Sequence, residues 1–242
     1  MIKIHVIVLL RKVCTSYLVC LMSTKLKPLK IKDCDLVAIA TGQRAQNLKE
    51  LRNNLLTCHP GCVYYHFWGG LIRPRFVDPE YNNDFASWAS HGIHDKKLAE
   101  RLGIIDPTEF RDIEDLRNEV IEVIERRLDE SEHLMWSHSD SQFNFIRSEI
   151  VVFNTRFKVN NPRELMDVVP NLSVTSIFYH FIDARRGSSV NEDDFRAWMK
   201  SMDGEYRGLY QMISDLDPYF ITLRELKNRL LQILVRYFEA DK

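Results

Sequence analysis

Two histidines, each within a run of apolar and aromatic residues, are the best candidates for chemistry in this sequence. His66 is the fourth residue of VYYHF, and His180 is the fourth residue of IFYHF. A histidine among such neighbours is buried and needs a hydrogen-bond partner. The carboxylates of Asp84 and Asp194, which each begin an Asp-Phe-x-x-Trp segment, are suited to this role. Two interpretations follow: structural His–Asp contacts between helices, or a site in which both pairs converge across a pseudo-twofold axis.

A metal site is an alternative use of the first histidine. His91 and Asp95 are four residues apart and would share a face of one helix, so together with His66 and His94 they could bind a metal ion. The second half of the chain has no matching set. The sequence therefore predicts no metal and no other cofactor, and a metal-dependent enzyme is kept as the alternative function.

Arginine-bearing loops after the two Tyr-His-Phe segments are the third candidate. Arginine beside aromatic side chains can clamp a phosphate or carboxylate with two hydrogen bonds. Alternatively, these arginines are solvated and pair with neighbouring acids. The candidate ligand-binding residues are His66, Trp68, Arg73, Arg75, Tyr81, Asp84, His180, Arg185, Arg186 and Asp194.

Composition excludes several function classes. The formal net charge is −1 and the pI is about 6.7, so no global field attracts nucleic acid or anionic lipid. The sequence has no P-loop, no dinucleotide-binding glycine pattern and no Gly-x-Ser-x-Gly. The sequence therefore predicts no particular reaction. The lack of a recognisable catalytic motif favours a protein that is not an enzyme.

The first 30 residues form an N-terminal extension. Apolar stretches at 2–10 and 13–22 are separated by Arg11 and Lys12, and each is shorter than the ~20 residues of a membrane helix. A true start near Met22 is the preferred interpretation; an appendage, or a signal or anchor, is the alternative. All five cysteines lie in the first quarter of the chain, which favours reduced thiols and a cytoplasmic location.

An internal repeat organises the rest of the chain. A shift of 114 positions aligns residues 33–67 with 147–181 without a gap, and the order of later motifs is also kept. Self-similarity of this kind indicates a repeated structural unit. We expect repeat 1 at 31–130, a junction at 131–144 and repeat 2 at 145–242.

Local patterns predict mainly helices. Asn47 and Asn161 each precede a glutamate by three residues, as N-caps do. Apolar residues recur every three or four positions over 113–128 and 223–237, and short apolar runs near 37–39 and 151–153 indicate small hairpins. The expected fold class is mainly α with short β-hairpins, at the margin of α+β.

Two longer runs of sequence resemble a known domain family. The run from Tyr65 to Trp88, with PEYNNDFASW at its end, and the run SIFYHFIDARR in the second half resemble an uncharacterised prokaryotic domain family of unknown function. The resemblance covers roughly residues 30–240. It implies an intracellular prokaryotic protein and supplies no reaction. The second copy has Asp193 where the first has Asn83, which puts a role for that asparagine in doubt.

The leading functional hypothesis is a binding or regulatory module. A cleft between the repeats would take a small anionic ligand or a protein partner, because both halves carry arginine-bearing loops. A structural interaction protein is the second alternative. The oligomeric state is not predicted.

Overall fold

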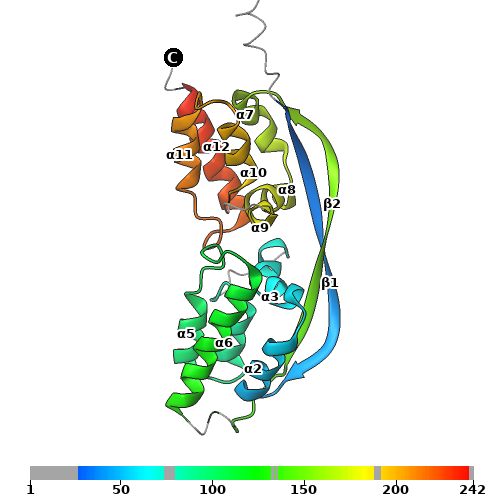
Figure 1. Cartoon of the computed structure of the whole chain (residues 1–242), viewed down its shortest axis with the longest axis vertical. Coiled ribbons are helices and arrows are strands. Elements are labelled where there is room, and N and C mark those ends of the chain that lie inside the picture. The colour runs from blue at the N-terminus through cyan, green and yellow to red at the C-terminus, as the bar shows by residue number, and fades with distance from the viewer. Residues whose placement is uncertain (1–26, 74–79, 132–133, 135, 188–191, 240–242) are drawn as a thin grey trace, which may run out of the picture.

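The chain folds as two stacked helical units beside one long β-ribbon (Figure 1). The computed structural model describes residues 27–73, 80–131, 134, 136–187 and 192–239. The N-terminal extension up to residue 26 lies outside the described residues, and so does Arg75. Within these ranges, no helix combines the length and apolarity that crossing a membrane requires.

The ribbon consists of two antiparallel strands, β1 (Leu29–Ala45) and β2 (Phe143–Val159). It spans both helical units along one side of the molecule (Figure 1). The apolar runs near 37–39 and 151–153 lie inside these strands, so the predicted small β component is present. The two runs belong to strands that pair with each other, and neither forms a local hairpin. At Gly42, β1 contains a bulge, with φ of +80° at the glycine and a register shift between Ala40 and Arg44.

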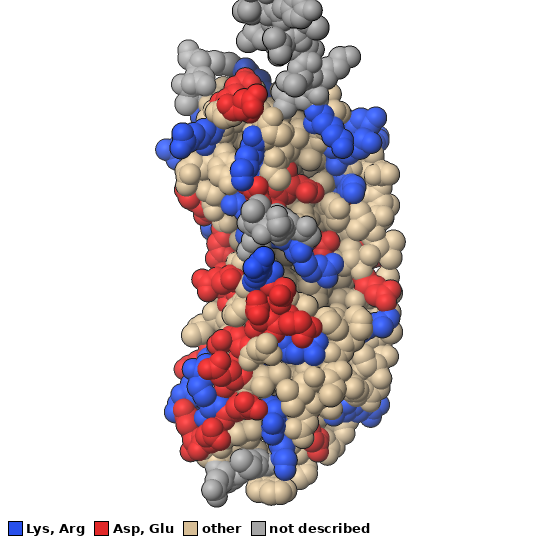
Figure 2. All heavy atoms as spheres, viewed as in Figure 1, with Lys and Arg blue, Asp and Glu red and all other residues tan. Residues whose placement is uncertain are grey.

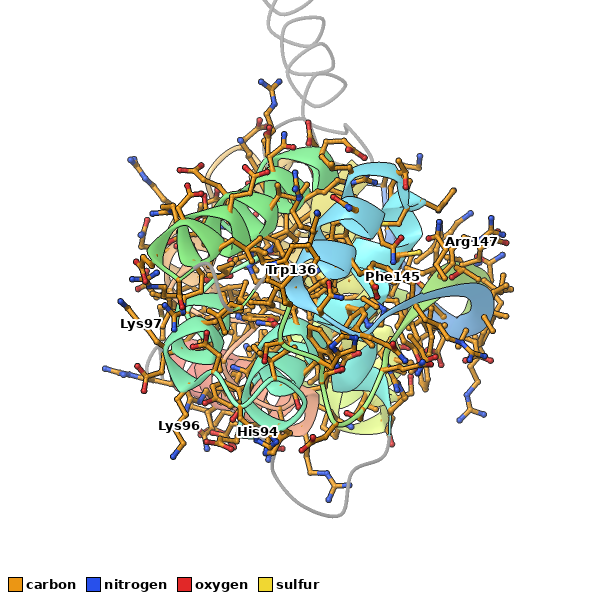
Figure 3. All side chains as sticks on the ribbon, turned by 90° about the horizontal axis from the view of Figure 1, so that it is seen from below. His94, Lys96, Lys97, Trp136, Phe145 and Arg147 are labelled. Atoms are coloured by element: carbon orange, nitrogen blue, oxygen red, sulfur yellow. The ribbon has the colours of Figure 1, made fainter. Side chains whose placement is uncertain are left out.

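Helices make up most of the described chain, as predicted. Figure 3 looks along the long axis and shows them on one side of the ribbon, with Phe145 toward the helices and Arg147 beside the strands. The first helical unit contains α2 (Leu48–Thr57), α3 (Pro60–Ile72), α4 (Asp84–His91), α5 (Lys96–Gly103) and α6 (Ile113–Glu130). The second contains η2 (Pro162–Glu164), α7 (Leu165–Val168), η3 (Val169–Asn171), α8 (Val174–Phe178), η4 (Tyr179–Asp183), α9 (Ala184–Gly187), α10 (Asp194–Lys200), α11 (Arg207–Ser214) and α12 (Leu223–Glu239).

The predicted helix caps are confirmed. Asn47 Oδ1 accepts from the Glu50 amide at 2.8 Å, and Glu50 Oε2 accepts from the Gln46 amide at 2.8 Å. Asn161 Oδ1 likewise accepts from the Glu164 amide at 3.2 Å. These bonds satisfy amides that have no partner inside the helix.

Aromatic side chains join the two units into one core. Tyr219, in the loop before α12, is fully buried and lies edge-on to Trp68 of α3, with ring centroids 5.0 Å apart. Tyr64 of α3 similarly meets Phe178 of α8 edge-on. Contacts of this kind between buried rings contribute about 0.5–1.5 kcal/mol each beyond their burial. The units therefore pack against each other as well as against the ribbon.

Candidate functional site

Both predicted His–Asp pairs form. Nδ1 of His66 lies 2.8 Å from Oδ2 of Asp84, and Nδ1 of His180 lies 2.7 Å from Oδ2 of Asp194. Each histidine is at most 3% exposed. α3 and η4 carry the histidines, and the first residues of α4 and α10 carry the carboxylates. Asn83 and Asp193, one residue earlier, cap those helices, which leaves the next carboxylate for the imidazole.

The other ring nitrogen of each histidine holds a strand. Nε2 of His66 accepts from the Ile146 amide at 3.2 Å, and Nε2 of His180 accepts from the Lys32 amide at 2.9 Å. Because an amide can only donate, each imidazole must accept at Nε2 and donate from Nδ1 to its carboxylate. Both ring nitrogens are thus used within the protein. Neither histidine is available to a metal or a substrate in this arrangement.

The two pairs do not converge in one site. Ile146 lies opposite Ala40 in the ribbon, and Lys32 is eight residues from Ala40 along β1. At about 3.3 Å per residue, the two strand contacts are about 26 Å apart. The structural interpretation of the His–Asp pairs therefore accounts for both of them.

Burial lowers the pKa of His66 below its ordinary value near 6.5, and the bond to Asp84 opposes this shift only in part. The unfolded chain therefore binds the His66 proton at a higher pH than the folded chain does. The resulting stability is complete above about pH 6.5 and is lost as the pH falls.

We expect a His66→Gln variant to lack this part of the pH dependence. Between about pH 7.5 and 5.5, wild type should lose up to about 1.4 kcal/mol per pH unit more than the variant does. Urea unfolding of both proteins across that range measures the difference. A wild-type-to-variant gap that stays constant with pH would contradict the assignment of a neutral buried His66.

The proposed metal ligands do not come together. The helix expected to carry both His91 and Asp95 ends at His91, where Gly92 forms its C-cap, and Asp95 instead caps the next helix. Asp95 is bound by Arg127 at 2.7 Å, and His94 lies 2.6 Å from Asp140. No group of three or more His, Cys, Asp or Glu side chains suited to a metal ion occurs in the described part of the chain.

The two arginine-bearing segments expected to be loops are parts of helices: Arg73 is the C-cap of α3, and Arg185 and Arg186 lie in α9. The Arg73 guanidinium lies over the Tyr65 ring, 4.3 Å from its centroid, and 3.9 Å from Asp84. Tyr81 lies against the helix end at Gly103, where an added Cβ would be 2.9 Å from the tyrosine ring. These residues belong to the first helical unit alone.

A pocket opens where the two units meet, and we call it the waist pocket. It brings together Trp68, Arg185 and Arg186 of the predicted residues, and adds Arg111, which no sequence pattern singles out. Arg111 lies far from the Tyr-His-Phe loops in sequence, and only the approach of the two units places it here. The pocket is lined by Tyr64, Trp68, Pro107, Thr108, Phe110, Arg111, Asp112, Ile113, Leu116, Ile182, Arg185 and Arg186.

The arginines of the waist pocket differ in their partners. Arg185 is 12% exposed and lies 3.7 Å from Asp193, while its Nε has no hydrogen-bond partner among the described residues. Burial lowers its pKa, and the Asp193 carboxylate opposes that effect. Arg186 pairs with Asp183 at 3.0 Å and lies over the Tyr64 ring, 4.6 Å from its centroid.

Arg186 also lines a second hollow. Its lining includes Asp194, the partner of His180, together with Asp183 and Glu192. Burial raises the pKa of Asp183, and Arg186 opposes this. With several carboxylates and one arginine, this hollow does not suit an anion.

Charge is mixed on the one face of the molecule that Figure 2 shows. On the face seen in Figure 2, basic and acidic side chains are interspersed, and neither sign covers it continuously. A nucleic-acid-binding face would present a basic stripe. The view agrees with the near-zero net charge.

Comparison with known proteins supports the fold and the resemblance. The structure of OrfY from Thermoproteus tenax superposes with a TM-score of 0.76 at 27% sequence identity, covering 88% of this chain and 97% of that one. No curated protein matches the sequence significantly. The model of a family of unknown function, DUF5752, matches residues 26–235. The chain, with its paired His–Asp contacts and shared ribbon, therefore belongs to the DUF5752 family.

Proposed function

We propose that the protein is a binding module whose waist pocket takes the anionic group of a small molecule. The observation that carries this proposal is the meeting of Arg111, Arg185 and Arg186 beside Trp68 in one pocket. Guanidinium groups bind phosphate and carboxylate oxygens in a bidentate geometry.

Size supports an anionic group rather than a whole bulky ligand inside the pocket. The waist pocket has a cavity volume of about 50 Å³, and one water molecule requires roughly 10–15 Å³ of such volume. A phosphate or carboxylate group is of the matching size. The remainder of the ligand would lie over Phe110 and Trp68 at the pocket wall.

Unused hydrogen-bond donors also favour an anion. Arg111 forms no ion pair or hydrogen bond with any described residue, and Arg185 Nε is buried without an acceptor. A buried donor without an acceptor costs about 1–3 kcal/mol. An anion between these two side chains would remove that cost at Arg185.

The waist pocket could also have a regulatory effect. Residues 107–116 come from the first helical unit, whereas Ile182 and Arg185 come from the second. A ligand that contacts both units binds more tightly when the units are packed together than when they are apart. It therefore stabilises the packed arrangement.

Thermal unfolding with anions tests the proposal. We expect pyrophosphate or citrate to raise Tm above a sodium chloride control of equal ionic strength, and Arg111→Gln to abolish the rise. Arg111 is exposed and unpaired in the described structure, so the variant should keep its fold. Arg73→Gln is the matched control, because Arg73 does not line the waist pocket. Absence of any specific shift, or equal loss in both variants, would overturn the proposal.

We also infer that the two units arose by duplication. Support comes from two equivalent hydrogen bonds whose acceptor carbonyls, just before the strands, are 114 residues apart. Trp88 Nε1 donates to the Ser141 carbonyl at 2.7 Å, and Trp198 Nε1 donates to the Lys27 carbonyl at 2.9 Å. In each case the helical unit binds the residue just before the strand that begins the other repeat.

A reducing, cytoplasmic location is part of the proposal. Cys34, Cys58 and Cys62 are free and buried. Cys58 and Cys62 are four residues apart around the start of α3, and an oxidising compartment favours disulfides between neighbouring thiols.

A further inference from the structure

The middle of β2 exposes large apolar side chains. Val151, Val152 and Phe153 are 53%, 40% and 50% exposed, although they lie in the centre of a 17-residue strand. Among the described residues the ribbon has two strands, and no further described strand lies beside the outer edge of either. Natural sheets commonly protect such edges with lysine, proline or a covering element.

The direction of the backbone groups along this edge follows from the two histidine contacts. The amides of Ile146 and Lys32 bind the histidines of the helices, so they point away from the ribbon. Lys32 lies opposite Asn154, and no register shift occurs between that pair and the pair of Ala40 and Ile146. In an antiparallel pair, every second residue points its N–H and C=O outward.

Ile150, Val152 and Asn154 therefore present their amides to the outer edge of β2. No hydrogen bond of these three amides to a helix, loop or side chain occurs in the described part of the chain. The α3 end of the edge is different, since Ser148 Oγ donates to the Gly61 carbonyl there. The free part of the edge begins beyond that contact.

We propose that two copies of this chain associate by antiparallel pairing of their β2 edges, with the twofold axis at Val152. The outward groups of Val152 then bind those of Val152 in the second copy, and Ile150 binds Asn154 of the second copy. The product is a four-stranded sheet with β1 at both outer edges.

The side chains of β2 are complementary to themselves in this register. Val151 comes to lie opposite Phe153 of the second copy, and a β-branched–aromatic pair of this kind is favourable in antiparallel sheets. Glu149 lies opposite Thr155, so no like charges face each other near the axis. The two apolar pairs occur symmetrically on the same face.

The β1 edge is a poorer partner. At the positions equivalent to Val151 and Phe153 it carries Val37 and Ile39, so the cross-strand pair would contain no aromatic ring. A contact between β1 of one copy and β2 of the next would not be isologous, and such contacts continue into open assemblies unless the rotation closes a ring. Pairing of β2 with β2 gives a closed dimer.

Sedimentation velocity of the full chain over a concentration series tests the dimer with two matched double variants. We expect wild type to sediment as a dimer that dissociates on dilution. Val151→Lys with Phe153→Lys places lysine opposite lysine twice across the axis, so the dimer should be lost. Val151→Lys with Phe153→Glu places lysine opposite glutamate and should retain it.

Both variants alter the same exposed positions, and circular dichroism checks that each keeps its helices. A wild-type monomer at every concentration would overturn the proposal, as would a dimer that survives in the lysine pair or is lost equally in both variants. Loss of association in Val37→Lys with Ile39→Lys would instead assign the interface to β1. Species that grow beyond a dimer would show open association and also contradict the closed pairing.

Discussion

Replacement of His66 by phenylalanine is expected to lower the free energy of unfolding by about 2.5–6 kcal/mol, although an aromatic ring still occupies the site. The Ile146 amide loses its acceptor, and Asp84 loses the imidazole bond. A buried donor left without a partner costs about 1–3 kcal/mol, and a hydrogen bond to a charged group contributes about 1.5–3 kcal/mol. Urea unfolding followed by circular dichroism measures the change.

The second unit provides an internal repeat of this experiment. His180→Phe removes the same two bonds, to Lys32 and Asp194, and should show a loss of similar size. His91 is exposed, so His91→Phe should change stability by no more than about 0.5 kcal/mol. If His66→Phe were as stable as His91→Phe, the imidazole would not be the connection between helix and strand that the geometry indicates.

Replacement of Asp193 by alanine should cost about 3–5 kcal/mol. Its side chain is fully buried and faces the guanidinium groups of Arg185 and Arg196, which are only 12% and 13% exposed. It also caps α10 by accepting from the Arg196 amide at 3.0 Å. Removing one partner from a buried ion pair leaves an uncompensated charge, which is strongly destabilising. Chemical denaturation measures the loss.

The Asp193→Asn variant separates the contribution of the negative charge to stability from the contribution of the helix cap. Asparagine keeps an oxygen for the cap, as Asn83 does at the equivalent position of α4, so this variant should lose less stability than Asp193→Ala. It also frees Arg185 from its counter-charge and should tighten pyrophosphate binding at the waist pocket. Equal stability losses in the two variants would show that the charge, and not the cap, accounts for the role of Asp193.

The helix starts and the apolar stripes could be predicted because they depend on neighbours in sequence. Asn47 and Glu50 meet within one helical turn whatever the rest of the chain does. The His66–Asp84 contact could be proposed for a related reason, since the buried imidazole needs a partner and the carboxylate begins the next helix. The failed metal site shows the limit: His91 and Asp95 have helical spacing, but Gly92 ends the helix between them.

The His–Asp pairs are therefore determined by the sequence itself, through burial that requires hydrogen bonds and through the repetition of the same residues in order. The second bond of each histidine was decided only by the tertiary structure. β1 and β2 begin more than a hundred residues apart and pair along their whole length, and no local pattern specifies which distant strand a short apolar run will join. The same holds for Arg111 and Arg185, which share a pocket because the packing of Tyr219 on Trp68 brings the two units together.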